Sequence, residues 1–401
     1  MLRHLDDRQL LAIALLTYST RPRGSVVHTL SLAEALADLG QRVTVWTLDR
    51  GGDGAFFRPV DPRVTVRIVP FPDVAGEEIG PRVQRSIHML ADAFDPTGCD
   101  VVHAQDCISA NAAGHCIRTV HHIDHFSTPE LAACHERAIT DPYAQVCVSA
   151  AVAAELLDGW GITATVIPNG VDAARFSDAA GPAGAGPRQA WRSRLGRYVL
   201  AVGGIEPRKG SLELLDAYAL VHKHIPDVQL VIAGGETLFD YRDYRIRWNQ
   251  RIAALGVEPV VLGPVAHDDL PALVAAAGVF AFPSVKEGFG LAAMEALAAG
   301  VPLVVSDLPV LREIFSGAAR FAADPVELAT HLMAALTEHD PVTRKIGQEL
   351  ADRYTWSAAA QRHLKLYQRL VTQPGPKTGT AYRTPPASGA HQQLPLADES
   401  Q

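Results

Sequence analysis

Short apolar runs alternate along the chain with longer stretches in which apolar residues recur every three or four positions. After a first run at residues 11–16, a helix is expected whose apolar face carries Val27, Leu30, Ala33 and Leu36. Because the runs lack polar alternation, they predict strands buried on both faces of a parallel sheet and joined by crossover helices. Further runs of this kind lie at residues 42–47, 64–69 and 100–103.

A second series of the same kind begins near residue 198. Between the two series, residues 177–189 read SDAAGPAGAGPRQ, and this glycine- and proline-rich composition predicts an interdomain linker. The pattern therefore predicts two doubly wound α/β domains that face a common cleft, since ligands bind beyond the carboxyl ends of parallel strands. The runs of the second series cover residues 198–202, 228–233, 260–262, 279–282 and 302–305.

The expected domain boundaries follow from this pattern. The first domain covers residues 1–176, the linker residues 177–190 and the second domain residues 191–355. A last helix is expected at about residues 356–371. From about residue 372 the chain is polar and rich in proline and glycine, which predicts a disordered tail over residues 372–401.

Composition narrows the class of protein. The 401 residues suit two domains, and the formal net charge of -8 argues against nucleic-acid binding and against a polybasic membrane anchor. Five cysteines without a CxxC pair favour a reducing, cytoplasmic compartment and give no zinc motif. The N-terminal apolar run, residues 10–16, is too short for a membrane span and follows a stretch of mixed charge, so it predicts a buried strand and not a signal peptide.

A basic glycine turn follows the first strand of the second series. Residues 203–210 read GGIEPRKG, which places Gly204, Arg208 and Lys209 between a strand and a helix. Glycines admit a close ligand, while a helix N-terminus and two cations favour an anion, so a pyrophosphate would fit there. A plain turn with solvated basic side chains is the alternative.

Two glutamates flank a second glycine-rich segment, EGFGLAAME, at residues 287–295. Glu287 lies in the expected loop and Glu295 in the following helix, about two turns further on. Carboxylates at this spacing can accept hydrogen bonds from the hydroxyls of one extended ligand. Solvated glutamates on an ordinary helix are the alternative, but the neighbours of Glu295 are almost all apolar, and an acid there needs a partner or a ligand.

Histidines cluster after the expected strand that ends at Val120. The segment HHIDH, residues 121–125, holds residue types that ligate metals, but no other ligand set with recognisable spacing accompanies it. A hydrogen-bonding His121 in the cleft is therefore the favoured interpretation, with no metal site. The segments HAQD at 103–106 and NGVD at 169–172 end other strands and could be ordinary turns.

Taken together, these motifs resemble glycosyltransferase family 4, whose members have the GT-B fold of two Rossmann-like domains. The resemblance spans roughly residues 11–370. It rests on GGIEPRKG, on EGFGLAAMEALAAGVPLVVSD, on TVHH, and on VIPNGVDAARF as an interdomain crossing. It implies a retaining, metal-independent transferase without a cofactor, which moves a sugar from a nucleotide-sugar donor, and a last helix that returns to the first domain.

The resemblance also implies roles for individual residues. Lys209, helped by Arg208, would neutralise the donor pyrophosphate. Glu295 would bind the ribose, and Glu287 would contact the transferred sugar. His121 would reach that sugar from the first domain. The remaining donor-site residues implied by the family are Gly24, Gly204, Phe289, Gly290 and Leu291.

The sequence departs from the family pattern at two places. Gly204 stands where the family often has the first basic residue of the turn, which leaves Arg208 as the candidate to replace it. Gly24 stands alone where the family often has a glycine pair. The acceptor, whether small molecule, lipid or glycan, and the donor base stay open, and peripheral membrane contact is compatible with the sequence. A nucleotide-sugar epimerase, a sugar phosphorylase and a non-catalytic binding protein remain alternatives.

Overall fold

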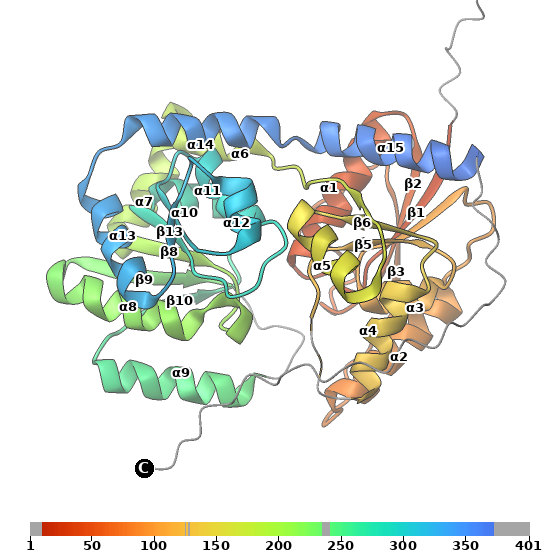
Figure 1. The fold of residues 1–401 in the computed structure, drawn as a ribbon, viewed down its shortest axis with the longest axis horizontal. Helices are drawn as coiled ribbons and strands as arrows, with labels where there is room; N and C mark the ends of the chain where they lie inside the picture. The colour runs from red at the N-terminus through yellow and green to blue at the C-terminus, as the bar shows by residue number, and fades with distance from the viewer. Residues whose placement is uncertain (1–9, 125, 127–128, 235–240, 373–401) are drawn as a thin grey trace, which may run out of the picture.

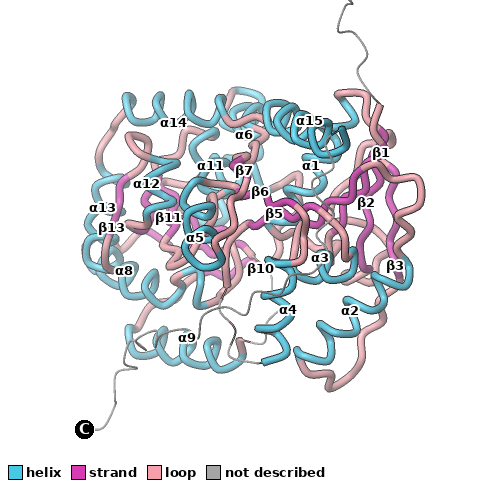
Figure 2. The backbone as a smooth tube through the Cα atoms, turned by 45° about the vertical axis from the view of Figure 1, so that its right-hand side comes forward, coloured by secondary structure: helices cyan, strands magenta, loops and turns pink. Residues whose placement is uncertain are grey.

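The structure is a computed structural model that describes residues 10–124, 126, 129–234 and 241–372. The tail expected to be disordered lies outside the described residues from residue 373 onward. Within the described residues the chain forms two parallel sheets, each placed between helices (Figures 1 and 2). The predicted architecture of two α/β domains is therefore confirmed.

The first sheet has seven strands in the order β3-β2-β1-β4-β5-β6-β7, and all neighbouring pairs are parallel. Its strands are β1 (Ala12–Leu16), β2 (Arg42–Leu48), β3 (Thr65–Val69), β4 (Val101–Ala104), β5 (Ile117–Val120), β6 (Ala144–Cys147) and β7 (Thr165–Val166). The helices between them are α1 (Gly24–Asp38), α2 (Ile79–Ala93), α3 (Cys107–Ala113), α4 (Pro129–Thr140) and α5 (Ala150–Trp160).

The second sheet has six parallel strands in the order β10-β9-β8-β11-β12-β13. Its strands are β8 (Arg197–Val202), β9 (Val228–Ala233), β10 (Val260–Gly263), β11 (Val279–Phe282), β12 (Leu303–Ser306) and β13 (Arg320–Ala322). Its helices are α6 (Ala173–Ala180), η1 (Pro182–Gly184), α7 (Ala185–Leu195), η2 (Pro207–Lys209), α8 (Ser211–His224), α9 (Arg242–Leu255), α10 (Leu270–Ala276), α11 (Leu291–Ala298), α12 (Pro309–Phe315), α13 (Pro325–Thr337) and α14 (Pro341–Arg353).

The strand order reverses between β1 and β4 in the first sheet and between β8 and β11 in the second. At such switch points the helices on the two sides of the strand pair leave a crevice at the carboxyl edge. In this chain both carboxyl edges border one cleft, since the residues after β1, β4 and β5 line it together with those after β8, β9 and β10. The fold thus brings loops from both domains to a single site.

The last helix, α15 (Trp356–Thr372), leaves the second domain and packs against α1 of the first (Figure 1). Ala359, Ala360, Leu366 and Tyr367 are buried there together with residues of the first sheet. Burial of this apolar face stabilises the helix against the first domain. The return of the final helix, implied by the family resemblance, is confirmed.

Residues 177–190 do not form the irregular linker that the sequence predicted. They lie mostly in α6, η1 and α7, and both α-helices pack against α10 of the second domain. Pro182 and Pro187 are tolerated because they occupy first turns, where the missing N–H has no helical partner. The prediction was wrong because it took small residues for flexibility, whereas here they permit close helix packing.

The chain crosses between the domains at the segment NGVD and again just before α15. The amide of Val171 donates to the carbonyl of Tyr354 at 2.7 Å, so the two crossings lie side by side. A Cβ atom on Gly170 would lie 2.3 Å from the amide nitrogen of Trp356, which explains the glycine at this position. Within the described residues, no helix is long and apolar enough to cross a membrane.

Candidate functional site

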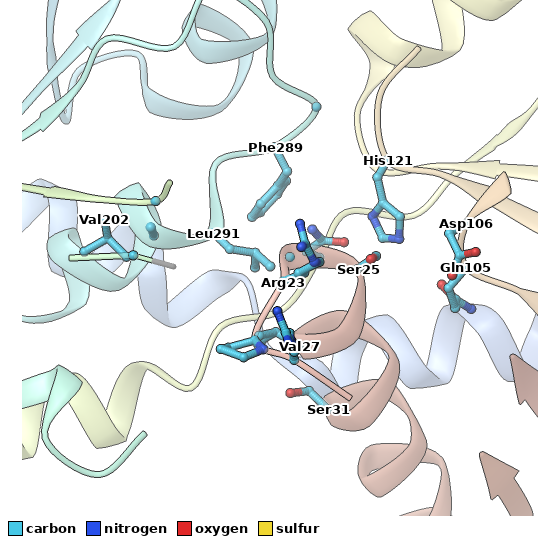
Figure 3. Close-up of a pocket in the computed structure, with 18 of the residues that line it drawn as sticks. Arg23, Ser25, Val27, Ser31, Gln105, Asp106, His121, Val202, Phe289 and Leu291 are labelled. Carbon is cyan, nitrogen blue, oxygen red and sulfur yellow. The ribbon is translucent and has the colours of Figure 1, made fainter. Parts of the chain in front are cut away.

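A cleft of about 1680 Å³ lies between the carboxyl edges of the two sheets (Figure 3). It is large enough to hold a drug-sized ligand or a nucleotide sugar. Every site residue predicted from the sequence lines it: Gly24, His121, Gly204, Arg208, Lys209, Glu287, Phe289, Gly290, Leu291 and Glu295. The fold therefore brings these residues together, while their roles stay predictions.

The basic turn after β8 depends on glycines for steric reasons. Gly203 has φ +146°, a backbone conformation that residues with a Cβ atom rarely adopt. Gly210 has φ +62°, and a Cβ atom there would lie 1.9 Å from the carbonyl oxygen of Pro283. These glycines let the turn fold back so that the Lys209 side chain lies along the strand end, with Nζ 4.9 Å from the centre of the Phe282 ring.

Lys209 and Glu287 form the central contact of the site. Nζ of Lys209 lies 2.6 Å from Oε1 of Glu287, and the Arg208 guanidinium donates to the same oxygen at 2.8 Å. Arg208 also pairs with Glu206 at 3.1 Å. The glutamate side chain is 9% exposed and the lysine side chain 20%, so the contact is largely shielded from water.

These contacts fix the charges of the cluster. Burial alone would raise the pKa of Glu287, but the charges of Lys209 and Arg208 outweigh it and hold the pKa at about 2. Burial lowers the pKa of Lys209, and the Glu287 charge opposes this. Burial also lowers the pKa of Arg208, but the charges of Glu287 and Glu206 outweigh this effect and raise the pKa above its usual value. Glu287 is therefore ionised at neutral pH and can accept hydrogen bonds but not donate a proton.

Arg208 is not placed as a free substitute for the basic residue that is missing at position 204. Its guanidinium bridges Glu206 and Glu287 and reaches the carbonyl of Lys286 at 3.4 Å. Because two carboxylates already compensate its charge, little of it remains for a ligand. The structure leaves Lys209 as the better placed of the two cations to meet an anion in the cleft.

Glu295 lies on α11, in the same cleft, in a different electrostatic setting. In the described part of the chain no hydrogen bond or ion pair engages its carboxylate, although it is half-buried among apolar residues. Burial raises its pKa to about 7, against the opposing charge of Arg175 and with a smaller contribution from Asp172. A half-buried acid without a partner is a candidate to bind a ligand.

Replacing Glu295 with glutamine is expected to stabilise the fold at pH 8 but not at pH 5. The folded protein keeps a proton on Glu295 up to a pKa of about 7, whereas the unfolded chain releases it near 4.5, so stability falls as pH rises through this window. Glutamine cannot ionise, so the variant avoids the loss of stability that deprotonation of Glu295 causes at pH 8. For each kcal/mol of unfolding free energy regained in this way, Tm rises by roughly 2–4 °C. Thermal melts of both proteins at the two pH values measure it, and an equal gain at both would contradict the assignment.

The segment before α11 turns sharply into the helix. Gly290 has φ +94° and is the N-cap of α11, and a Cβ atom there would lie 3.0 Å from the Phe315 ring. Phe289 is 3% exposed and packs edge-on against Tyr354 at 5.4 Å, so its side chain belongs to the core. Leu291 is half-buried and faces the cleft at the first position of the helix (Figure 3).

On the opposite side of the cleft, α1 begins at Gly24. Its N-terminal residues, Gly24 and Ser25, line the cleft, and Ser25 is labelled in Figure 3. The amides of the first turn of a helix have no partner within the helix, which makes this end a candidate site for an anion. With 15 residues, the helix carries a substantial positive partial charge at this end. The N-terminus of α1 and Lys209 therefore approach the cleft from different domains with the same sign of charge.

His121 enters the cleft at the end of β5. Its ring packs edge-on against His28 at 4.9 Å, and Nδ1 of His28 is 2.8 Å from Oδ1 of Asn169 in the crossing segment. Nε2 of His121 is buried and has no hydrogen-bond partner within the described residues. Burial, followed by the charge of His122, lowers the pKa of His121 well below its usual range. A neutral imidazole therefore offers one unused nitrogen to a ligand.

The two domains touch directly between His121 and the Glu287 loop. A Cβ atom on Gly288 would lie 1.5 Å from the carbonyl oxygen of His121. The glycine thus allows the backbone of the second domain to meet the backbone of the first without intervening atoms. Because Gly288 follows Glu287 immediately, this contact sets the spacing between the glutamate and the imidazole.

Metal ligation is not indicated by the geometry of the described residues. His122 pairs with Asp124 at 3.1 Å, but no group of three or more His, Cys, Asp or Glu side chains is arranged to hold an ion in the ranges that the structure describes. His125 lies outside them. The absence of a metal requirement stays a proposal.

Sequence reasoning missed several side chains that line the cleft. Arg175, in the crossing segment, is the largest charge acting on Glu295. Gln105 is fully buried, and its amide nitrogen and oxygen have no partner within the described part of the chain. Both lie in the motifs NGVDAARF and HAQD, so their position was visible, but nothing in the sequence showed where the side chains point.

Two α/β domains with parallel sheets face each other, and the final helix returns to the first domain; this arrangement defines the GT-B class of glycosyltransferases. The family model described as Glycosyltransferase Family 4 matches residues 22–175, and the model described as Glycosyl transferases group 1 matches residues 189–349. The chain belongs to glycosyltransferase family 4. It is an enzyme of the hexosyltransferase type.

Two relatives illustrate the similarity. The phosphatidyl-myo-inositol mannosyltransferase of Mycobacterium leprae is 28% identical over 383 residues, which cover 88% of this chain and 94% of the relative. The GDP-mannose:cellobiosyl-diphosphopolyprenol alpha-mannosyltransferase of Komagataeibacter xylinus is 30% identical over 54% of this chain and 53% of its own. Among solved structures, Anabaena HepE in complex with UDP-glucose superposes with a TM-score of 0.71 at 22% identity and covers 90% of this chain and 100% of its own.

Proposed function

We propose that the enzyme transfers a hexose from a nucleoside diphosphate sugar to a phosphate-bearing acceptor, with retention of anomeric configuration and without a metal ion. The observation that carries the proposal is the contact of Lys209 with Glu287 at 2.6 Å, in a cleft that Glu295 and the N-terminus of α1 also line. The cation Lys209 matches the diphosphate of a donor, the ionised carboxylate of Glu287 matches its sugar, and the second acid, Glu295, matches its ribose.

The charges of the cleft support the following arrangement of the donor. The diphosphate lies between Lys209 and the amides at the start of α1, where both domains contribute positive charge. The ribose hydroxyls lie at Glu295, whose carboxylate accepts two hydrogen bonds once it ionises. The sugar lies between Glu287 and His121, which the contact at Gly288 holds close together.

Departure of the nucleoside diphosphate builds negative charge on its phosphate oxygens. Lys209 and the helix amides stabilise that charge in a partly dry site, the task that a divalent metal performs in other enzymes. Glu287, with its pKa at about 2, cannot act as a general acid, so it orients the sugar hydroxyls. We infer that the acceptor attacks from the face of the departing phosphate, which acts as the base and leads to retention.

The relatives support the acceptor class. Two of them, an inositol lipid mannosyltransferase and a polyprenol-linked mannosyltransferase, carry phosphate-bearing lipids in their names. A lipid or glycan acceptor with a phosphate group is therefore the class proposed here, with no nucleic acid involved. All five cysteines are free thiols, which supports the proposed cytoplasmic location.

The transfer reaction is expected to survive removal of metal ions. The assay incubates the enzyme with GDP-mannose, UDP-glucose or UDP-N-acetylglucosamine and a lipid extract, with and without exhaustive EDTA treatment, and follows both nucleoside diphosphate release and labelled product. Transfer that depends on the acceptor and persists in EDTA supports the proposal.

Other outcomes identify the alternative enzymes. Release of sugar phosphate in the presence of phosphate would identify a phosphorylase, and conversion of the donor sugar to its epimer without an acceptor would identify an epimerase. Activity that only Mg²⁺ or Mn²⁺ restores would reject the metal-free mechanism.

A further inference from the structure

Arg118 is a buried cation on the first-domain side of the cleft. It lies on β5, is 4% exposed and lines the cleft. Its Nε donates to the carbonyl of Thr119 at 3.1 Å, and Nη2 lies 3.5 Å from Sγ of Cys107. Nη1 is buried and has no hydrogen-bond partner among the described residues.

No carboxylate compensates this guanidinium by direct contact in the part of the chain that the structure describes. Asp106 lies near enough to feel its charge, but the carboxylate accepts hydrogen bonds from the amides of Ser109 and Tyr18, at 2.8 and 3.0 Å, and from the Thr17 hydroxyl at 3.2 Å. It caps α3 and forms no ion pair with Arg118. Within the described residues, the arginine side chain is thus held in place by a carbonyl and a thiol.

The cleft extends to Arg118 between α3 and α4. The residues that line this extension include the apolar or thiol-bearing Cys107, Ile108, Leu131 and Cys134. Asp124 also lines the cleft, near enough for its charge to act on Cys107 and His135, but its carboxylate pairs with His122 at 3.1 Å. His135 closes it, with Nδ1 3.3 Å from Sγ of Cys107. A charge in such surroundings carries a desolvation penalty unless an opposite charge pairs with it. The diphosphate and the ribose of the donor are assigned above to the second domain and to α1, and the sugar is assigned to His121 at the end of β5.

We propose that Arg118 is the anchor of an acceptor subsite and pairs with the phosphate group of the acceptor. Arginine suits this task because its planar fork binds phosphate oxygens with two parallel hydrogen bonds, and Nη1 is unused. The inference rests on the proposed function, since it describes the second substrate of that reaction. The part of the cleft between α3 and α4 is thus the place where acceptors would be selected by their charge.

The test uses inorganic phosphate as the probe, with the full-length enzyme saturated with GDP or UDP so that the donor site is filled. Calorimetric titration is expected to show phosphate binding to the wild type. In Arg118→Gln the affinity falls about ten- to a hundredfold. Arg118→Lys keeps part of it, because a point charge remains, and serves as the second variant if the glutamine variant does not fold. Arg137→Gln, which removes an exposed guanidinium on α4, keeps the wild-type affinity.

Glycerol phosphate and vesicles that contain anionic phospholipid distinguish the two sources of phosphate. Arg118-dependent binding of glycerol phosphate assigns a soluble phosphorylated acceptor, and Arg118-dependent vesicle binding assigns a lipid headgroup. A wild type that binds no phosphate, or a folded Arg118→Gln protein with unchanged affinity, overturns the inference. These readouts are independent of transfer, so loss of the proposed function in the donor assay is a separate result.

Discussion

Replacing Lys209 with alanine is expected to lower kcat/KM for the sugar donor by about a hundred- to a thousandfold, the loss typical of a removed charge-stabilising group. The lysine Nζ lies 2.6 Å from Glu287 and is the cation best placed to meet the departing diphosphate. Its loss removes stabilisation of the leaving group and leaves Glu287 with Arg208 alone. Steady-state kinetics of donor hydrolysis or transfer measure the effect.

Lys223→Ala is the matched control for this variant. Lys223 is an exposed lysine near the end of α8 in the same domain and does not line the cleft. The control is expected to keep the wild-type kcat/KM, and Lys209→Arg to recover part of the loss because it restores the charge. If the alanine variant at Lys209 folds and turns over like the control, the lysine does not stabilise the leaving group.

Replacing Gly288 with alanine is expected to reduce turnover by about a hundredfold, as misplacement by about 1 Å at a reacting centre does. The added Cβ atom would lie 1.5 Å from the carbonyl oxygen of His121, so the two loops must separate. Affinity for free nucleoside diphosphate is expected to fall less than turnover, since Lys209 and Glu295 bind it from the second domain and only the α1 amides act from the first. Turnover kinetics and calorimetry on the same protein separate the two effects.

Gly186→Ala provides the control for a glycine without such a contact. Gly186 lies in α7, and a Cβ atom there meets nothing within 4 Å. The substitution is expected to leave turnover unchanged and to stabilise the helix by about 1 kcal/mol at most. A Gly288→Ala protein with wild-type turnover would show that the contact between the domains does not position Glu287 against His121.

Much of the fold could be predicted because buried parallel strands leave a plain signal. The run at residues 279–282 is apolar throughout and the run at residues 228–233 is apolar apart from the exposed Gln229, and they coincide with β11 and β9. Two strands escaped the prediction. β6 carries a buried glutamine, and β13 has only three residues, so neither forms a clear apolar run.

The segment around η1 shows why composition alone misled. Glycine and alanine are typical of linkers, but they also allow close approach, and a Cβ atom on Gly184 would lie 2.0 Å from the carbonyl oxygen of Ala179. The sequence cannot show whether a small residue is exposed or packed. That information comes from the partner, here Ala179 of α6.

The sequence predicted which residues line the candidate site, but not which of their side chains pair with one another. Each predicted residue lines the cleft because the motifs follow strand ends, where parallel sheets place their loops. The pairing of Arg208 with Glu206 and Glu287 was not predictable, since it depends on side-chain reach across two loops. Arg118, whose Nη1 has no hydrogen-bond partner among the described residues, was missed because it lies within a strand, where a single basic residue gives no motif.

The most direct test of the account is calorimetric titration of free GDP and UDP into the wild type and into Glu295→Ala and Glu287→Gln, with melting curves to establish that each variant is folded. The account predicts that Glu295→Ala weakens nucleoside diphosphate binding about ten- to a hundredfold, because a charge-assisted hydrogen bond to the ribose is lost. Glu287→Gln is predicted to keep the affinity, because its carboxylate faces the sugar. Unchanged affinity in a well-folded Glu295→Ala protein would contradict the proposed donor site.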